Sequence, residues 1–258
     1  MMVNAAELKP GMRICIAGAS SDIGQALLEV LAGSDMKIGA HYISASKSLG
    51  RFIEAGDCTQ TNIKLYGGDL STQSACDSLI DSFVDWAGGI DSLIHLAGNV
   101  KNPSHWEELT ADDWKADLDI NLSAPFFLAR RAMKYMKSYG GRIVLTSTAS
   151  AKHGGGRFSM AYGVAKAGVE CLVKGLAREG ASSEILVNAV APGFIETKFH
   201  TDRMERNEQD LKERAKLVPL GRAGKPEDVA RMVVYLISQG GNYITGECIS
   251  VSLSLIHI

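Results

Sequence analysis

The sequence predicts a single α/β domain over residues 1–258, built on a seven-stranded, mainly parallel, doubly wound sheet with helices on both faces. Short β-branched runs alternate with helical stretches along the whole chain, and no low-complexity linker or repeat of fixed period interrupts them. Such alternation is typical of strand–helix–strand units joined by right-handed crossovers. The length of 258 residues also suits one domain, because α/β folds can exceed about 200 residues without splitting.

The strands are expected where short apolar runs stop at turn-forming residues. Two of these runs, at 13–17 (Arg-Ile-Cys-Ile-Ala) and 92–97 (Ser-Leu-Ile-His-Leu-Ala), are nearly continuous, as expected for parallel strands that are buried on both faces. In chain order, the seven expected strands are 12–17, 36–42, 62–66, 90–97, 142–147, 186–191 and 247–252.

The helices are expected between these strands, and two of them have readable N-terminal caps. Thr110 precedes Ala-Asp-Asp and Ser71 precedes Thr-Gln-Ser, so each hydroxyl is expected to cap the helix that follows it. The expected helices are 22–32, 71–87, a long one near 111–138, 160–181 and 226–238.

Composition and charge narrow the class of protein. A net charge of −2 argues against a nucleic-acid-binding protein, which usually carries a basic stripe. No apolar run approaches the about 20 residues of a membrane span, and the N-terminus does not resemble a signal peptide. The five cysteines are dispersed without a CxxC pair, and the six histidines show no metal-binding spacing. We therefore expect a cytoplasmic protein with no metal and no membrane partner.

A glycine-bearing turn, Gly18-Ala-Ser-Ser-Asp-Ile-Gly24, leaves the first expected strand. Gly18 allows a tight turn, and Gly24 allows the next helix to approach the strand closely. The N-terminus of that helix offers unpaired amides and a positive dipole end to a pyrophosphate. Glycines also simply end strands, but the position after the first strand favours a dinucleotide site in a Rossmann-type fold.

The end of the second expected strand favours NADP(H) over NAD(H). Sites that prefer NAD place an acid about 20 residues after the turn, where it binds the ribose 2′-hydroxyl. Residues 41–44 (His-Tyr-Ile-Ser) contain no acid, Asp35 precedes the strand, and Glu54 is too far along. A 2′-phosphate is therefore expected near Tyr42 and Ser44.

Tyr162 and Lys166 are four residues apart in a helical stretch, so they share a face. An exposed amphipathic pair is the alternative explanation, but the chemistry suits proton transfer. Lowering the pKa of a phenol from about 10 by three units needs about 4 kcal/mol. An ammonium about 4 Å away supplies about that much at an effective dielectric constant near 20. We therefore predict that Lys166 lowers the pKa of Tyr162, which acts as the proton donor.

A hydroxyl is also needed to hydrogen-bond the substrate carbonyl where negative charge develops. The fifth expected strand ends in hydroxyls at Thr146, Ser147, Thr148 and Ser150. Hydroxyls at a strand end are usually turn formers, and their nearness to Tyr162 is what makes them candidates.

Together these residues resemble the short-chain dehydrogenase/reductase family over nearly the whole chain. The matching motifs are Gly18–Gly24 (TGxxxGxG), Gly68-Asp69-Leu70, His95-Leu-Ala97-Gly98 (NNAG), Asp-Ile-Asn121-Leu, Tyr162-Gly-Val-Ala-Lys166 (YxxxK) and Pro192-Gly193-Phe-Ile195-Glu-Thr197 (PGxxxT). The sequence departs from the family at two of these motifs, because Asp22 replaces the middle glycine of the turn and His95 replaces the first asparagine of NNAG.

The resemblance implies a role for each site residue. Tyr162 is the general acid in reduction, Lys166 also binds the nicotinamide ribose, and Asn121 holds a proton-relay water. The catalytic serine position falls on Thr148, with Ser147 as the alternative. The residues implied at the cofactor are Gly18, Ser20, Ser21, Asp22, Ile23, Gly24, Tyr42, Ser44, Asp69, Leu70, Ala97, Gly98, Tyr162, Lys166, Pro192, Gly193, Ile195 and Thr197.

The resemblance is greatest to the 3-oxoacyl-carrier-protein-reductase-like type, with residues 194–217 as a substrate lid. It implies an NAD(P)(H)-dependent oxidoreductase that interconverts a carbonyl and a secondary alcohol, with an acyl thioester as one substrate class. It also implies a homo-oligomer, either a tetramer or a dimer. The alternatives are a non-catalytic NADP-binding regulator on the same fold and an enoyl reductase, whose tyrosine and lysine are usually spaced differently.

Overall fold

The computed structural model describes residues 8–32, 35–43, 49–50, 52 and 62–254. Within this part of the chain, seven parallel strands form one sheet in the order β3-β2-β1-β4-β5-β6-β7. The strands are β1 (Arg13–Ala17), β2 (Lys37–Tyr42), β3 (Ile63–Gly67), β4 (Ser92–His95), β5 (Gly141–Thr146), β6 (Ile185–Pro192) and β7 (Cys248–Val251). The predicted doubly wound α/β fold is confirmed, and every described strand pair is parallel.

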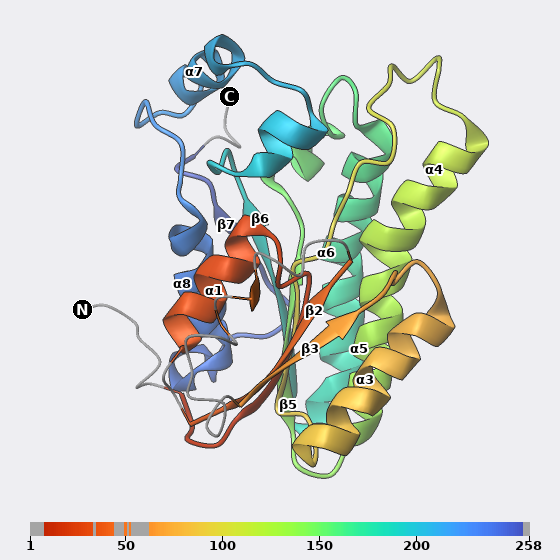
Figure 1. The fold of residues 1–258 in the computed structure, drawn as a ribbon, viewed down its shortest axis with the longest axis vertical. Coiled ribbons are helices and arrows are strands. Elements are labelled where there is room, and N and C mark those ends of the chain that lie inside the picture. The colour runs from red at the N-terminus through yellow and green to blue at the C-terminus, as the bar shows by residue number, and fades with distance from the viewer. Residues whose placement is uncertain (1–7, 33–34, 44–48, 51, 53–61, 255–258) are drawn as a thin grey trace.

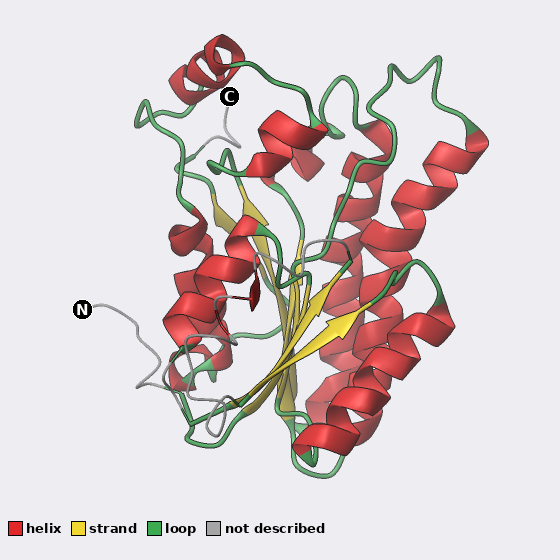
Figure 2. Ribbon diagram, in the orientation of Figure 1, coloured by secondary structure: helices red, strands yellow, loops and turns green. Residues whose placement is uncertain are grey.

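Helices cover both faces of this sheet, as Figures 1 and 2 show. One face packs against α1 (Asp22–Leu31) and α8 (Pro226–Ile237). The other face packs against α3 (Gln73–Ala87), α5 (Ala124–Met136) and α6 (Met160–Gly180), with α4 (Ala111–Leu118) beside α6.

The position of β1 inside the sheet, between two layers of helices, explains why its sequence is continuously apolar. Ile14 and Ile16 belong to the core under α1 and α8, whereas Cys15 and Ala17 belong to the core under α3 and α5. Successive side chains of a strand point to opposite faces, so a strand between two helical layers buries all of them.

The helix starts confirm one expected cap and correct the other. The Thr110 hydroxyl accepts a hydrogen bond from the Asp113 amide (3.1 Å) at the start of α4, as expected. The cap of α3 is Thr72, which accepts from the Ala75 amide (3.3 Å), and not Ser71. The Ser71 amide instead donates to Asp69 (2.9 Å), so the chain is still turning at that position.

The long helix expected over 111–138 is interrupted. A π-helical segment, Asp119–Ser123, separates α4 from α5 and contains Asn121. One wide turn of this kind shifts the side chains that follow it relative to a regular helix, and such turns are frequent at functional sites. The apolar period of the sequence carried no sign of the interruption.

The expected lid, residues 194–217, contains helical structure that the sequence did not predict. It consists of a π-helical turn (Phe199–Arg203) and α7 (Glu208–Lys216). None of the α7 residues is fully buried, and only Leu211 and Ala215 pack against a buried apolar cluster, so the apolar pattern is too short to predict a helix. It begins with a capping box, in which Asn207 accepts from the Asp210 amide (2.9 Å) and Asp210 from the Asn207 amide (3.3 Å).

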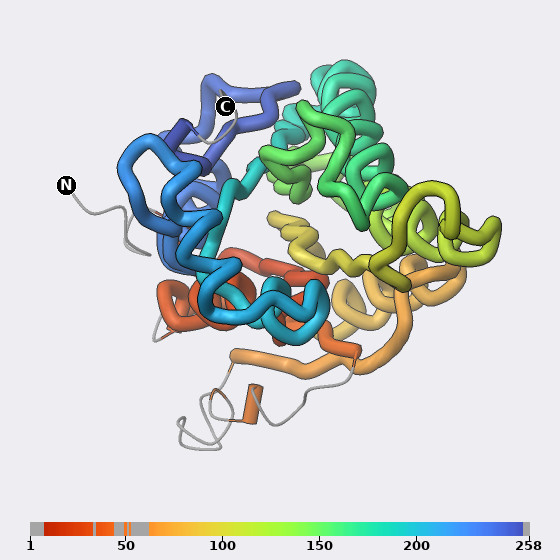
Figure 3. Tube along the Cα trace, turned by 90° about the horizontal axis from the view of Figure 1, so that it is seen from above, coloured from red at the N-terminus to blue at the C-terminus, as the bar shows by residue number. Residues whose placement is uncertain are grey.

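The carboxyl ends of the strands point towards the top of Figure 1, where α7 of this segment lies. Figure 3, seen from above, shows the segment in cyan and blue beside the start of α1. This is the edge at which parallel sheets bind ligands. No helix in the described part of the chain is long and apolar enough to cross a membrane.

Candidate active site

The glycine turn after β1 is compact because two residues hold it. Gly18 has φ +85°, and a Cβ at this position would lie 2.5 Å from the Ala97 nitrogen. The Ser21 hydroxyl donates to the Gly18 carbonyl (2.8 Å) and accepts from the Gly24 amide (3.1 Å). Ser21 is thereby the N-cap of α1, and the first turn of that helix faces the carboxyl edge of the sheet.

His41 joins this turn to the end of β3, a role that the sequence did not reveal. Its Nδ1 accepts from the Gly18 amide (3.3 Å), so its Nε2 donates to the Gly68 carbonyl (2.9 Å). Burial lowers the pKa of His41, which keeps the ring neutral and able to accept from Gly18. A histidine within the apolar strand β2 was the only sign of this role in the sequence.

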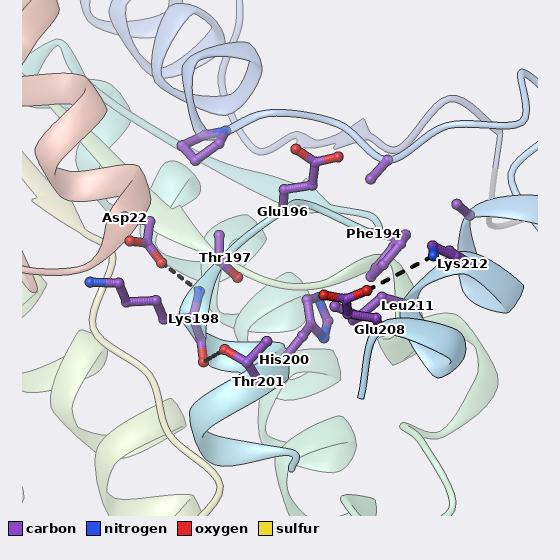
Figure 4. A pocket seen from close by; sticks show the side chains of 13 residues that line it. Asp22, Phe194, Glu196, Thr197, Lys198, His200, Thr201, Glu208, Leu211 and Lys212 are labelled. Carbon is purple, nitrogen blue, oxygen red and sulfur yellow. Dashed lines mark hydrogen bonds and ion pairs between the residues drawn. The ribbon is translucent and has the colours of Figure 1, made fainter. Parts of the chain in front are cut away.

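Asp22 ties the turn to the lid segment. It is the first residue of α1, and its Oδ2 accepts a hydrogen bond from the Lys198 amide (2.7 Å; Figure 4). Asp22 therefore has a helical backbone, and the fold does not need the glycine usual at this position. Its carboxylate occupies the positive end of the α1 dipole, where a pyrophosphate would also be favoured.

Tyr162 and Lys166 lie near the start of α6 and share a face, as predicted. The Lys166 Nζ lies 5.6 Å from the centroid of the Tyr162 ring and donates to the Thr146 carbonyl (2.9 Å). Burial lowers the pKa of Lys166 to about 7. Burial also raises the pKa of Tyr162 to about 12, while a hydrogen bond with Thr148 acts in the opposite direction.

The expected lowering of the Tyr162 pKa by Lys166 is therefore wrong for this structure. The sequence argument counted the attraction between an ammonium and a phenolate but not the loss of water around both groups. Here desolvation dominates, and the Lys166 ammonium is held at the Thr146 carbonyl over the face of the Tyr162 ring.

The two candidate hydroxyls after β5 have different surroundings. Ser147 is buried, and its Oγ lies 3.0 Å from the Lys166 carbonyl oxygen and 2.9 Å from the Glu170 carboxylate. Thr148 is partly exposed, contacts the Ser150 hydroxyl (3.1 Å) and lies close enough to the phenol of Tyr162 to lower its pKa. Thr148 therefore lies beside the predicted proton donor, whereas the Ser147 hydroxyl binds to residues of α6.

Asn121 is fully buried, and its side-chain amide holds the loop after β4. Its Nδ2 donates to the Asn99 carbonyl (2.6 Å) and the Asp117 carbonyl (2.9 Å), and its Oδ1 accepts from the Asn99 amide (3.2 Å). A Cβ on Gly98 would lie 3.0 Å from the Asn121 Oδ1 and 3.3 Å from the Lys166 Nζ. Because Gly98 has no side chain, Asn121 and Lys166 can both lie close to its Cα. The relay water expected at Asn121 stays a prediction.

A cavity of about 520 Å³ joins the glycine turn to the Tyr162–Lys166 pair. The predicted residues that line it are Ser20, Ser21, Asp22, Ile23, Gly98, Ser147, Thr148, Tyr162, Lys166, Pro192, Gly193, Ile195 and Thr197. Predicted residues outside its lining are Gly18, Gly24, Tyr42, Asp69, Leu70, Ala97 and Asn121, and Ser44 lies outside the described residues. A neighbouring cavity of about 560 Å³ shares Asp22, Thr197, Lys198 and His200 with it (Figure 4).

These features fit a nicotinamide dinucleotide. The capped start of α1, with Ser20, Ser21 and Asp22, and the proton donor Tyr162 line the same cavity. The cavity also contains His200, Arg206 and Arg214, which the sequence did not single out. These three residues lie in a charged segment without apolar periodicity, so only the folded chain shows which of its charges point inward.

Comparisons with known proteins agree with this geometry. Residues 18–253 match the family model described as enoyl-(acyl carrier protein) reductase. A solved structure, the short-chain dehydrogenase/reductase from Serratia marcescens BCRC 10948, is 26% identical with a TM-score of 0.86, covering 96% of this chain and 98% of that one. The chain belongs to the short-chain dehydrogenase/reductase family.

Other members of the short-chain dehydrogenase/reductase family are also similar to this chain. The 3-oxoacyl-(acyl-carrier-protein) reductase of Aquifex aeolicus is 32% identical over 243 residues, covering 92% of this chain and 94% of that protein. The probable 2,4-dienoyl-CoA reductase of Bacillus subtilis is 32% identical over 249 residues, covering 92% and 93%. A short-chain dehydrogenase from Burkholderia cenocepacia J2315, solved in complex with NADP, shares the fold at 24% identity and a TM-score of 0.86, covering 95% and 98%.

This short-chain dehydrogenase/reductase is of the 3-oxoacyl-carrier-protein-reductase-like type. It is an NAD(P)-dependent oxidoreductase that interconverts a carbonyl and a secondary alcohol. The comparisons give no support to the alternative of a non-catalytic regulator.

Proposed function

We propose that this protein reduces a small-molecule ketone to a secondary alcohol with NADP(H), using Tyr162 as the proton donor. The observation that carries the proposal is the shared cavity. Tyr162, Lys166 and Thr148 line the same space as the glycine turn that precedes α1. A proton donor, a cation and a hydroxyl thus meet where a nicotinamide and a carbonyl would meet.

The proposed residue roles follow from their positions. When bound, the nicotinamide supplies a hydride to the carbonyl carbon. Tyr162 gives its proton to the carbonyl oxygen, so the product is an alcohol and the reaction consumes one proton. Thr148 donates a hydrogen bond to the same oxygen, where negative charge develops before the proton arrives.

Lys166 stabilises the phenolate that the proton transfer leaves on Tyr162. The Lys166 Nζ lies 5.6 Å from the centroid of the Tyr162 ring, so a protonated Lys166 attracts the negative charge that develops there. Since burial raises the pKa of Tyr162 to about 12, the phenol is protonated at neutral pH, as a donor in reduction must be. Asn121 acts as a positioning residue, because its amide holds the backbone of the β4 loop beside Lys166.

We propose NADP(H) as the cofactor and residues 194–217 as the substrate lid. Tyr42 at the end of β2 and the exposed Ile43 after it carry no carboxylate that would repel a 2′-phosphate. The lid proposal is supported by Phe199, whose ring centroid lies 6.0 Å from that of Tyr162. A clear preference for NADH in a comparison of Michaelis constants would contradict the choice of cofactor.

The decisive experiment replaces Tyr162 by phenylalanine and follows NADPH oxidation with a panel of ketones, 3-oxoacyl thioesters, sugars and an enoyl thioester. The wild type should reduce at least one carbonyl substrate. Tyr162→Phe should lose about 10²–10⁴ in kcat, as expected for a general acid, and still bind NADPH by fluorescence titration. Full turnover in the variant, or reduction of the enoyl thioester alone, would contradict the proposal.

We also propose a single-domain cytoplasmic protein that forms a homo-oligomer. The four described cysteines form no disulfide among the described residues, which suits a reducing compartment. Phe126 on α5 and Met160 and Val164 on α6 are apolar and exposed, which suits an interface between copies of the chain. Light scattering of the purified protein tests whether it forms a homo-oligomer, and a monomer at micromolar concentration would contradict the proposal.

A further inference from the structure

Two arginines of the lid segment line the cavity that contains Tyr162. Arg206 and Arg214 are both partly buried, and the Arg206 Nη1 and Arg214 Nε are buried without a hydrogen-bond partner among the described residues. No ion pair in the described part of the chain involves either guanidinium. These two cations therefore point into the cavity unneutralised.

This arrangement is unfavourable for the protein alone. Burial lowers the pKa of both guanidinium groups, and the charge of Arg206 lowers the pKa of Arg214 further. The carboxylate that acts on Arg206, Asp210, is held in the capping box of α7 by the Asn207 amide (3.3 Å). Since a buried charge is costly unless it is paired, two neighbouring cations favour an anion between them.

A continuous row of rings connects Arg214 to the proposed proton donor. The Phe199 ring centroid lies 6.0 Å from that of Tyr162 and 5.7 Å from that of His200. The Phe194 centroid lies 5.0 Å from that of His200, and the Arg214 Cζ lies 5.4 Å from the Phe194 centroid. Figure 4 shows His200 beside Phe194.

His200 adds a neutral polar group to the same wall. Its buried Nδ1 lacks a hydrogen-bond partner among the described residues. Burial, together with the charges of Arg206 and Arg214, lowers its pKa to about 4. The ring is therefore neutral near pH 7 and does not add a third positive charge.

We propose that Arg206 and Arg214 bind an anionic group, a carboxylate or a phosphate, on the carbonyl substrate that Tyr162 reduces. The proposal rests on the proposed function and narrows its substrate class to ketones that carry such a group. A guanidinium presents a planar fork of N–H donors that matches both anions. The acids that line the cavity, Asp22 and Asp202, form no ion pair with either arginine among the described residues. Asp22 accepts from the Lys198 amide (2.7 Å) and Asp202 from the Thr201 hydroxyl (2.7 Å).

The kinetic test compares matched substrates with and without the anion. The probes are 4-oxopentanoate against its methyl ester, and acetoacetyl-CoA against the phosphate-free acetoacetyl-N-acetylcysteamine. Arg206→Met and Arg214→Met should raise KM for the anionic member of at least one pair about ten- to hundredfold, as expected for loss of a charged hydrogen bond. KM for the neutral member and for NADPH should stay unchanged. The control Lys216→Met removes an exposed cation from α7, the helix that contains Arg214, and should change none of these KM values.

A binding test without turnover separates this proposal from the proposed function. In the protein without added cofactor, the anionic member of at least one of the two probe pairs should raise the melting temperature, whereas its neutral partner should not. Both arginine variants should abolish the shift and still melt cooperatively. Equal melting-temperature shifts with the anionic and the neutral probes would overturn the proposal. A rise in KM confined to NADPH would also overturn it, because that result would assign the arginines to the cofactor phosphates. If no ketone is reduced at all, the proposed function is wrong, and the binding test still decides the anion site.

Discussion

Replacing Thr148 by valine should slow ketone reduction strongly and leave the fold intact. Thr148 is partly exposed and lines the cavity close to the phenol of Tyr162, and the described hydrogen-bond partner of its hydroxyl is Ser150, through the hydroxyl (3.1 Å) and the amide (3.4 Å). Removing a donor that faces a developing oxyanion typically costs about 10²–10³ in kcat, or about 3–4 kcal/mol. The variant also loses the N-terminal cap of a short 3₁₀ turn, at a cost of about 1 kcal/mol in stability.

Ser147→Ala should show the opposite pattern. The Ser147 Oγ is buried between the Lys166 carbonyl and the Glu170 carboxylate, so its loss leaves a polar group of α6 without its partner. That change should cost about 1–3 kcal/mol in the free energy of unfolding. Turnover should fall less than tenfold, because both described partners of the hydroxyl belong to α6.

The two variants are compared with wild type by single-turnover reduction at saturating NADPH and by urea unfolding. Thr148→Ser is the matched control, since it keeps the donor and should retain most of the activity. If Ser147→Ala loses more than a hundredfold in rate while Thr148→Val stays active, the assignment of the carbonyl donor to Thr148 is wrong.

Three further outcomes are expected. Gly18→Ala places a methyl group 2.5 Å from the Ala97 nitrogen at φ +85°, so it should weaken NADPH binding in a fluorescence titration and lower the melting temperature; wild-type values for both would contradict the steric argument. Asp22→Asn keeps an acceptor for the Lys198 amide but removes a negative charge where a pyrophosphate is favoured, so the Kd for NADPH should fall severalfold at low salt; an unchanged Kd would contradict it. Because the pKa of His200 is lowered from 6.5 to about 4, the folded protein binds fewer protons there than the unfolded chain. The stability that His200 contributes is thus complete above pH 6.5 and lost as the pH falls towards 4, by up to about 3 kcal/mol, and urea unfolding of His200→Gln should show a weaker pH dependence between these limits.

Local patterns in the sequence were sufficient to predict the strands of the sheet and where most of the motifs lie on strands and helices. The apolar run at 13–17 became β1, and Tyr162 and Lys166 came to share a face of α6 because a helix brings residues four apart together. The same kind of reasoning missed the π-helical segment around Asn121, because a helix with one wide turn has nearly the same apolar pattern as a regular one.

The sequence by itself determined the doubly wound order of the elements and the set of reactive side chains at one edge of the sheet, because both follow from periodicity and from the chirality of strand crossovers. The tertiary structure decided which groups lose water and which neighbours face them. It separated Thr148 from Ser147, reversed the expected direction of the Tyr162 pKa, and directed Arg206 and Arg214 into the cavity. Desolvation and contact geometry arise from segments that meet only after folding, so no local pattern encodes them.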